Sequence, residues 1–172
     1  WLNYYSNQIK VLNLKIEHVF GPNDSKSKFV PWLISQIKSG YFPISLNQGE
    51  ELRDFIHVSD VANAFLFLLK HKLKDKQFHD FNIGSGTFLQ IKEFVKLAEE
   101  INSELKSKNT IPYKLKRTNV LQKGKRGNTK INQLKELGWH PNCTIEQGIL
   151  ELLNWKFPIA KKENYQDFLV TV

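Results

Sequence analysis

The sequence of 172 residues contains no methionine, a single cysteine and no apolar run long enough to span a bilayer. A lone Cys143 excludes an internal disulfide and has no second thiol with which to hold a metal. We expect it to be a small, buried or half-buried residue in a reducing compartment. The chain also shows no charged-then-apolar leader. These absences predict a cytoplasmic protein with no membrane partner and no metal site.

The start of the chain is unusual because methionine is missing even from position 1. Residues 1–5 are typical of the last turns of an amphipathic helix rather than of a chain terminus. We therefore expect that a preceding segment is absent from this sequence. With 41% hydrophobic residues, the chain can still bury the core of one domain.

The net charge of +8 raises the question of nucleic-acid binding. Basic residues are spread along the chain, with denser patches at 70–76 and 114–126. A platform for single strands interleaves aromatic and basic residues, but the second patch has only Tyr113 beside it. Zinc-finger and helix-turn-helix signatures are also absent. We expect no nucleic-acid partner, although a nonspecific polyanion surface stays open as an alternative, and a phosphate pocket needs only a few of these charges.

The spacing of apolar residues predicts alternating strands and helices, which is typical of an α/β fold. Strands are expected at 11–19, 43–46, 79–83 and 111–115, and helices at 1–9, 28–39, 60–72, 91–105, 131–137 and 144–155. Gly40 is expected to end the second helix, and Thr144 to cap the last one.

The run from Arg53 to Ala62 combines a charged strand entrance with the start of a helix. Phe55 and Ile56 favour a strand and would point to opposite faces, and Ser59 or Asp60 would cap the following helix. From residue types alone, Arg53 either faces an anion site or pairs with Asp54 or solvent at a strand end.

A Gly-x-Gly sequence at Gly84–Gly86 follows the expected strand 79–83. The dinucleotide-binding fingerprint needs a third glycine, but that position is Leu89, and no acidic residue ends a following strand at the right distance. We interpret these glycines as a tight strand-to-helix turn.

Four segments occur in an order that resembles one family. They are Leu14–Pro22, Arg53–Ala62, Phe81–Gly86, and Leu137–Pro141 followed by Ile145–Ile149. Together they are similar to the extended short-chain dehydrogenase/reductases, the NAD-dependent epimerases, dehydratases and reductases that act on nucleotide sugars. The resemblance covers about residues 1–153 and places the chain in the C-terminal portion of such an enzyme.

The resemblance implies an α/β fold that joins the C-terminal end of a Rossmann-type parallel sheet to a small mixed substrate-binding domain. Residues 1–22 and 51–86 would be the remnant of the Rossmann-type domain. Residues 23–50 and 87–155 would form the substrate-binding domain, and 156–172 a tail.

In this family, a glycine-rich loop binds NAD or NADP, and a Tyr-x-x-x-Lys pair moves the proton that accompanies hydride transfer. No tyrosine of this sequence is followed four residues later by lysine. The resemblance therefore implies an enzyme half with no catalytic residue of its own, inactive alone, whose cofactor is held mainly by a missing N-terminal half. The complete protein would be a homodimer and act as an oxidoreductase, isomerase or lyase in O-antigen or related polysaccharide biosynthesis.

The resemblance also implies roles for individual residues toward a nucleoside-diphosphate sugar. Arg53 and Arg117 would bind the diphosphate, through bidentate bonds that a lysine does not reproduce. The other implied substrate contacts are His18, Lys28, Phe29 and Leu46, with Leu46 or its neighbour Ser45 against the base; Val19 would lie near the nicotinamide. His18 stands where the family commonly has an asparagine. The alternative interpretation is that His18 is a strand-end histidine bonded to backbone, with no role in binding. Two other classes stay open: a non-catalytic nucleotide-sugar-binding module and a basic nucleic-acid-binding protein.

Overall fold

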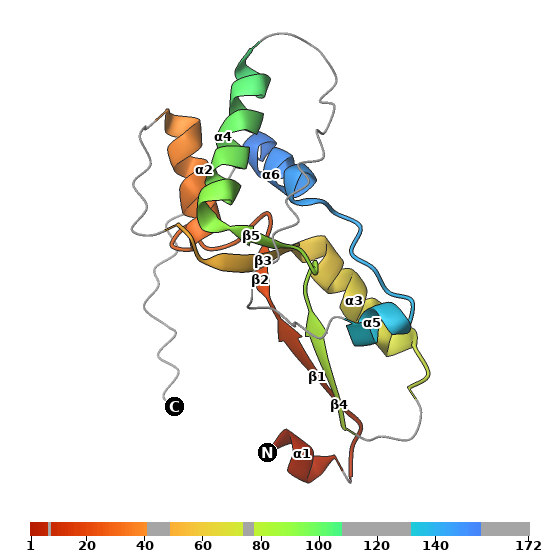
Figure 1. Cartoon of the computed structure of the whole chain (residues 1–172). Coiled ribbons are helices and arrows are strands. Elements are labelled where there is room, and N and C mark those ends of the chain that lie inside the picture. Colours follow the sequence, from red (N-terminus) through yellow and green to blue (C-terminus); the bar gives the residue numbers. More distant parts are fainter. Residues whose placement is uncertain (7, 41–48, 74–77, 108–131, 156–172) are drawn as a thin grey trace.

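The computed structural model of the protein describes residues 1–6, 8–40, 49–73, 78–107 and 132–155. These residues form an α/β fold with parallel strand pairs (Figure 1), as the sequence predicts. The strands are β1 (Val11–Ile16), β2 (His18–Phe20), β3 (Leu52–His57), β4 (Phe78–Ile83) and β5 (Phe88–Gln90). The helices are α1 (Leu2–Tyr5), α2 (Phe29–Ser39), α3 (Val58–Lys70), α4 (Ile91–Lys106), α5 (Asn132–Glu136) and α6 (Ile145–Asn154).

The strands form two small sheets. β1 and β4 pair in parallel, from Val11 opposite Phe78 to Ile16 opposite Ile83. The other sheet has the order β2-β3-β5, in which β2 is parallel and β5 antiparallel to β3. The prediction of one strand over 11–19 is therefore wrong. The backbone turns at Glu17, whose carbonyl accepts from the Val19 N–H at 2.8 Å, and this turn sends the chain from one sheet to the other.

β3 contributes to two hydrophobic cores because its side chains alternate between two faces. Phe55 packs in the first core, which α2, α4 and α6 supply with residues such as Phe94. Ile56 packs in the second core, with Ala64 of α3 and Ile83 of β4. Figure 1 shows α2, α4 and α6 gathered beside the three-stranded sheet, and α3 and α5 beside the β1–β4 pair. The predicted opposition of Phe55 and Ile56 is confirmed.

The helix ends test the capping predictions. Gly40 follows α2 in the left-handed conformation, with φ of 74°, and Thr144 caps α6 by accepting from the Gln147 N–H. Both predictions are confirmed. The predicted cap of α3 is wrong, since the helix begins at Val58 and the side chain of His57 accepts from the Ser59 N–H. An imidazole nitrogen here takes the place of the usual carboxylate or hydroxyl oxygen.

Some predictions fall outside the described residues, namely the strands at 43–46 and 111–115, the site residues Leu46 and Arg117, and the tail at 156–172. α1 covers only Leu2–Tyr5 of the helix expected over 1–9.

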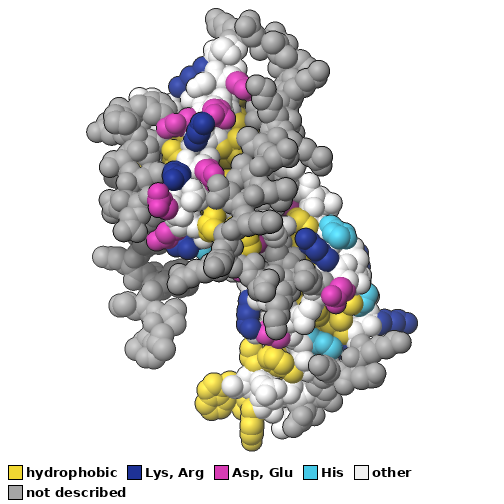
Figure 2. All heavy atoms as spheres, in the orientation of Figure 1, with side chains coloured by type: hydrophobic (Ala, Val, Ile, Leu, Met, Phe, Trp, Pro, Cys, Tyr) yellow, Lys and Arg dark blue, Asp and Glu magenta, His cyan; other side chains and the backbone are white. Residues whose placement is uncertain are grey.

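Within the described ranges, no helix is both long and apolar enough to cross a membrane. Figure 2 shows lysine side chains interleaved with carboxylates over α4, where Lys96 pairs with Glu100 at 3.9 Å.

Candidate functional site

A cavity of about 530 Å³ lies where β2, β3 and the first turns of α2 and α4 meet. Its lining includes these residues to which the sequence assigned binding roles: His18, Val19, Lys28, Phe29 and Arg53. Glu17, Asp24, Val30, Phe55 and Ile91 complete the lining. The structure therefore brings together predicted binding residues that lie up to 35 positions apart in the sequence, from His18 to Arg53.

The geometry of β3 explains why Arg53 and His18 face the same cavity. Arg53 and Phe55 share one face of the strand, because alternate residues point the same way. His18 lies opposite Phe55 across the β2–β3 pair, and their rings are 6.1 Å apart in an edge-to-face arrangement. Parallel pairing thus places a cation from β3 beside an imidazole from β2.

The N-terminus of α2 forms another wall of the cavity. Lys28 is the N-cap residue, and its own side chain makes no capping hydrogen bond. Lys28, Phe29 and Val30 all line the cavity, so the first backbone N–H groups of an 11-residue helix lie at its wall. A helix N-terminus carries a partial positive charge and free N–H donors, which suit an anion.

Both cations of the cavity pair with carboxylates. Arg53 pairs with Glu51, and Lys28 Nζ lies 2.9 Å from Asp24 Oδ1. The alternative in which Arg53 pairs with its neighbour Asp54 is wrong, because Asp54 is fully buried and bonded elsewhere. Arg53 keeps about a third of its side chain exposed at the cavity.

The pKa of His18 lies below its ordinary value of 6.5, first because of partial burial and then because of the positive charge of Arg53. Glu17, Asp54 and Glu51 act in the opposite direction but do not outweigh these effects. His18 is therefore neutral at neutral pH and brings no charge to the cavity. Because the pKa of His18 is lowered in the folded protein, the unfolded chain takes up a proton more readily than the folded protein does. The contribution of His18 to stability is therefore fully present above pH 6.5 and is lost as the pH falls through the folded-state pKa.

We predict that an NMR titration of the His18 ring will give a midpoint below 6.5 and that Arg53→Ala will move it upward. Removing the guanidinium removes one of the two causes of the shift. Lys92→Ala, which removes a cation paired with Glu50, serves as the matched control and should leave the midpoint in place. A midpoint at or above 6.5 in the unmodified protein would contradict the prediction.

Asp54 anchors the Gly84–Gly86 turn to β3. Its Oδ1 accepts from Ser85 N at 2.8 Å and from Ser85 Oγ at 2.6 Å, and its Oδ2 accepts from Gly86 N at 2.9 Å. A side chain at position 84 would collide with this carboxylate, so glycine is required there. The interpretation of Gly84–Gly86 as a turn is confirmed, but the turn leads into β5 before α4 begins, not directly into a helix.

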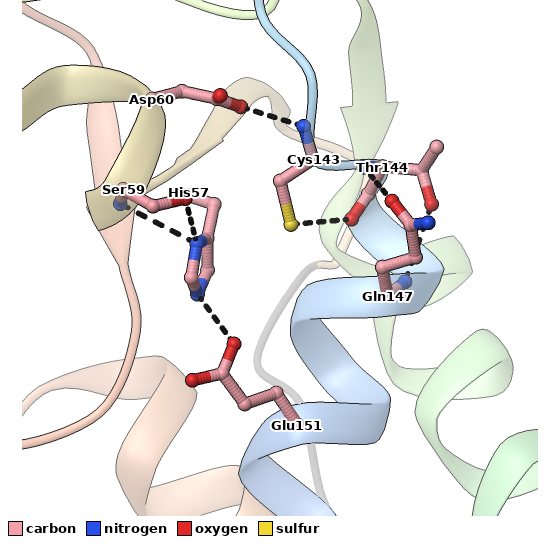
Figure 3. A network of polar contacts seen from close by, with 7 residues as sticks. All are labelled: His57, Ser59, Asp60, Cys143, Thr144, Gln147 and Glu151. Atoms are coloured by element: carbon pink, nitrogen blue, oxygen red, sulfur yellow. Dashed lines mark hydrogen bonds and ion pairs between the residues drawn. The ribbon is translucent and has the colours of Figure 1, made fainter. Parts of the chain in front are cut away.

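Figure 3 shows a second polar network, which fixes α6 and the loop before it against α3. Asp60 accepts from the backbone N–H groups of Asn142 and Cys143, at 2.9 and 3.0 Å. The buried ring of His57 contacts Ser59 Oγ at 2.8 Å through Nδ1, and its Nε2 lies 3.4 Å from Glu151 Oε2 on α6. These contacts give His57 and Asp60 structural roles, because they join α3 to α6 and to the loop before it.

Cys143 lies in this network and is half-buried, as predicted. Burial, followed by the negative charges of Asp60 and Glu151, raises the pKa of its thiol to about 11. The thiol is therefore protonated at neutral pH and is a poor nucleophile or metal ligand. In the part of the chain that the structure describes, no cluster of His, Cys, Asp or Glu could hold a metal ion.

Sequence reasoning missed several residues of the cavity, above all Phe55 and Asp24. Phe55 was recognisable as a strand residue on the same face as Arg53, but nothing in its type indicated a cavity wall. Asp24 carried a signal, because it precedes Lys28 by four residues, a spacing at which opposite charges often pair.

Comparison with known proteins shows which family this chain is similar to. Residues 2–84 match the NAD dependent epimerase/dehydratase family. A CDP-abequose synthase of Salmonella typhimurium is 31% identical over 157 residues, which cover 88% of this chain and 50% of that protein. The chain is therefore similar to the NAD dependent epimerase/dehydratase family, over a segment that makes up just under half of its length. The resemblance predicted from the four sequence segments is confirmed.

Solved structures share the fold of this chain. A dTDP-glucose 4,6-dehydratase of Bacillus anthracis in complex with NAD superposes with a TM-score of 0.66 at 25% identity, over 90% of this chain and 47% of that one. A UDP-glucose 4-epimerase of Thermotoga maritima, solved with UDP-glucose, gives 0.58 at 24% identity, over 81% and 43%. The chain thus spans about half the length of the relatives it matches.

The Gly84–Gly86 turn does not fit the pyrophosphate of a dinucleotide cofactor. The N–H groups of Ser85 and Gly86, in the one Gly-x-Gly turn of the described residues, already donate to Asp54. Val19 is half-buried and lines the cavity, which leaves it available for the predicted contact with a nicotinamide ring.

Proposed function

We propose that this chain is the substrate-binding half of an NAD(P)-dependent nucleotide-sugar epimerase, dehydratase or reductase, and that it binds the diphosphate of the nucleotide sugar. The observation that carries the proposal is the cavity lined by His18, Lys28, Phe29 and Arg53. The match of residues 2–84 to the NAD dependent epimerase/dehydratase family supports the enzyme class. A relative named for a CDP-sugar and a solved relative with bound UDP-glucose support the ligand class.

The chemistry of the cavity suits a diphosphate. Arg53 offers a planar fork of N–H donors that matches two phosphate oxygens, and Lys28 offers a second cation. The first N–H groups of α2 add neutral donors. Phe29 and Phe55 supply an apolar wall that suits the face of a sugar or a base. Arg117 and Leu46, both outside the described residues, remain proposed contacts for the diphosphate and the base.

We further propose that this chain by itself does not transfer hydride. The sequence has no Tyr-x-x-x-Lys pair, and the Gly84–Gly86 turn is occupied by Asp54. NAD or NADP, when bound, would supply the hydride chemistry, with Val19 as the contact from this chain. The remaining role of the described residues is to bind and orient the sugar nucleotide, which is itself a large part of catalysis. The relative named for abequose supports a place in surface-polysaccharide synthesis.

Calorimetric titration tests the diphosphate role. The protein is titrated with CDP, UDP and dTDP, and the tightest ligand is carried into the variants. We predict that Arg53→Ala and Arg117→Ala will each weaken binding by about 1–3 kcal/mol, because each removes charge-assisted hydrogen bonds to phosphate.

Lys92→Ala is the matched control, since Lys92 is a partly exposed cation paired with Glu50 and does not line the cavity. It should bind as the unmodified protein does. Unchanged affinity in both arginine variants would remove the diphosphate assignment.

A further inference from the structure

The positive and negative charges that line the cavity balance, so the net charge of the lining does not attract an anion. Lys28 and Arg53 bring two positive charges, and Glu17 and Asp24 bring two negative ones. Glu51, just outside the lining, pairs with Arg53 and adds a further carboxylate. A site proposed to bind a diphosphate therefore has no excess positive charge among these groups. Long-range attraction contributes little here, so a bound phosphate has to replace an existing partner.

The two carboxylates that pair with the cations are held differently. Asp24 exposes 18% of its side chain, and its Oδ1 also accepts from the backbone N–H of Ser25 at 2.8 Å. Glu51 exposes 49% of its side chain. Its backbone carbonyl accepts from Ile91 N at 3.1 Å, which fixes the main chain and leaves the side chain free to turn. Glu51 can leave Arg53 for water at little expense, whereas Asp24 is tied to the turn before α2.

Arg53 and Glu51 also lie close together along the chain. Glu51 immediately precedes β3 and Arg53 is the second residue of the strand, so the two side chains are two positions apart, and they form an ion pair. The carboxylate of Glu51 is thus always close to the guanidinium of Arg53. It competes with a phosphate for the guanidinium at a high effective concentration. Exposed pairs of this kind are weak, which is the condition under which a ligand with two phosphoryl groups can displace them.

We propose that Glu51 is a displaceable counter-ion of Arg53, which occupies the guanidinium in the free protein and swings into solvent when the diphosphate binds. The inference rests on the proposed diphosphate site and adds a contact that holds its affinity down. Arg53 is then the cation that changes its partner from a carboxylate to the ligand, whereas Lys28 keeps its pair with Asp24, which is held by the turn before α2. The exchange releases one carboxylate, that of Glu51, when Arg53 takes up the diphosphate, and it needs no proton.

The test is the affinity of the Glu51→Gln variant for the tightest of CDP, UDP and dTDP, measured by calorimetry on the protein. Glutamine keeps the size and shape of the side chain but removes its charge. We expect binding to tighten about two- to fivefold, the range that the loss of one exposed ion pair allows. Glu50→Gln is the matched control, because Glu50 is the preceding residue and pairs with Lys92 at 3.3 Å instead. It should leave the affinity unchanged.

A double-mutant cycle separates this inference from the proposed function. If Glu51 acts through Arg53, then Glu51→Gln has no effect in the Arg53→Ala background. Weaker binding by Glu51→Gln, with Arg53→Ala also weaker, would mean that Glu51 positions the arginine, and the counter-ion proposal would be overturned. Unchanged binding by Arg53→Ala would overturn the diphosphate site itself. Equal effects of Glu51→Gln with and without Arg53 would reject the pairing and leave the site standing.

Discussion

Alanine at position 54 should lower the free energy of unfolding by about 3–5 kcal/mol. The carboxylate of Asp54 is completely buried and accepts from Ser85 N, Ser85 Oγ and Gly86 N. Its removal leaves the N–H groups of Ser85 and Gly86 without this acceptor, in a space that the methyl group of alanine does not fill, while Ser85 Oγ can still donate to the Thr87 carbonyl at 3.3 Å. Urea unfolding followed by far-ultraviolet circular dichroism measures the change by linear extrapolation.

Asp80→Ala is the matched control for this substitution. Asp80 also lies on a strand and also accepts from other side chains, Lys15 and Asn13, but its carboxylate is exposed to solvent. It should unfold at nearly the same urea concentration as the unmodified protein. Asp54→Asn keeps one acceptor oxygen and should fall between the two. Equal stability of Asp54→Ala and Asp80→Ala would show that the turn does not depend on the buried carboxylate.

Phe94→Ala should have a comparable effect, about 3–5 kcal/mol, because it opens a large void in the first core. The ring is inaccessible to solvent and its centroid lies 4.3 Å from that of Phe55 and 5.9 Å from that of Phe20. It also contacts Phe29 at 6.3 Å. Because Phe29 and Phe55 line the cavity, we expect this variant to bind nucleoside diphosphates more weakly as well.

Phe65→Ala supplies the control for the loss of an aromatic ring. Phe65 lies on α3, and 41% of its surface is exposed. Its truncation removes little buried area and should change the free energy of unfolding by far less. Phe94→Leu, which keeps more of the volume, should lose less than Phe94→Ala. If Phe65→Ala and Phe94→Ala were equally destabilised, the assignment of Phe94 to the centre of the core would be wrong.

The sequence was most informative where the signal is local. Gly40 and Thr144 end and begin helices through bonds to residues within a few positions, so residue type alone predicts them. The alternation of Phe55 and Ile56 is likewise a property of any strand. The family resemblance then named His18, Val19, Lys28, Phe29 and Arg53, which the structure brings to one cavity.

Long-range partners were not predictable in the same way. The donors to Asp54 lie 31 and 32 residues away, and those to Asp60 lie 82 and 83 residues away. An acidic residue at a helix start favours a local cap, and only the folded chain shows that Asp60 bonds to a distant loop instead. The sequence also could not predict that Arg53 pairs with Glu51 instead of Asp54, because only the fold shows that the Asp54 side chain is buried.

The alternation along β3 also limits how the length of this chain can change. Phe55 belongs to one core and Ile56 to the other, so inserting or deleting one residue in the strand would exchange the two sets of side chains in both cores at once. It would also turn Arg53 away from the cavity and Asp54 away from the turn that it anchors. We therefore expect insertions and deletions to be tolerated in the connecting segments and not within the six residues of β3, whose register both cores depend on.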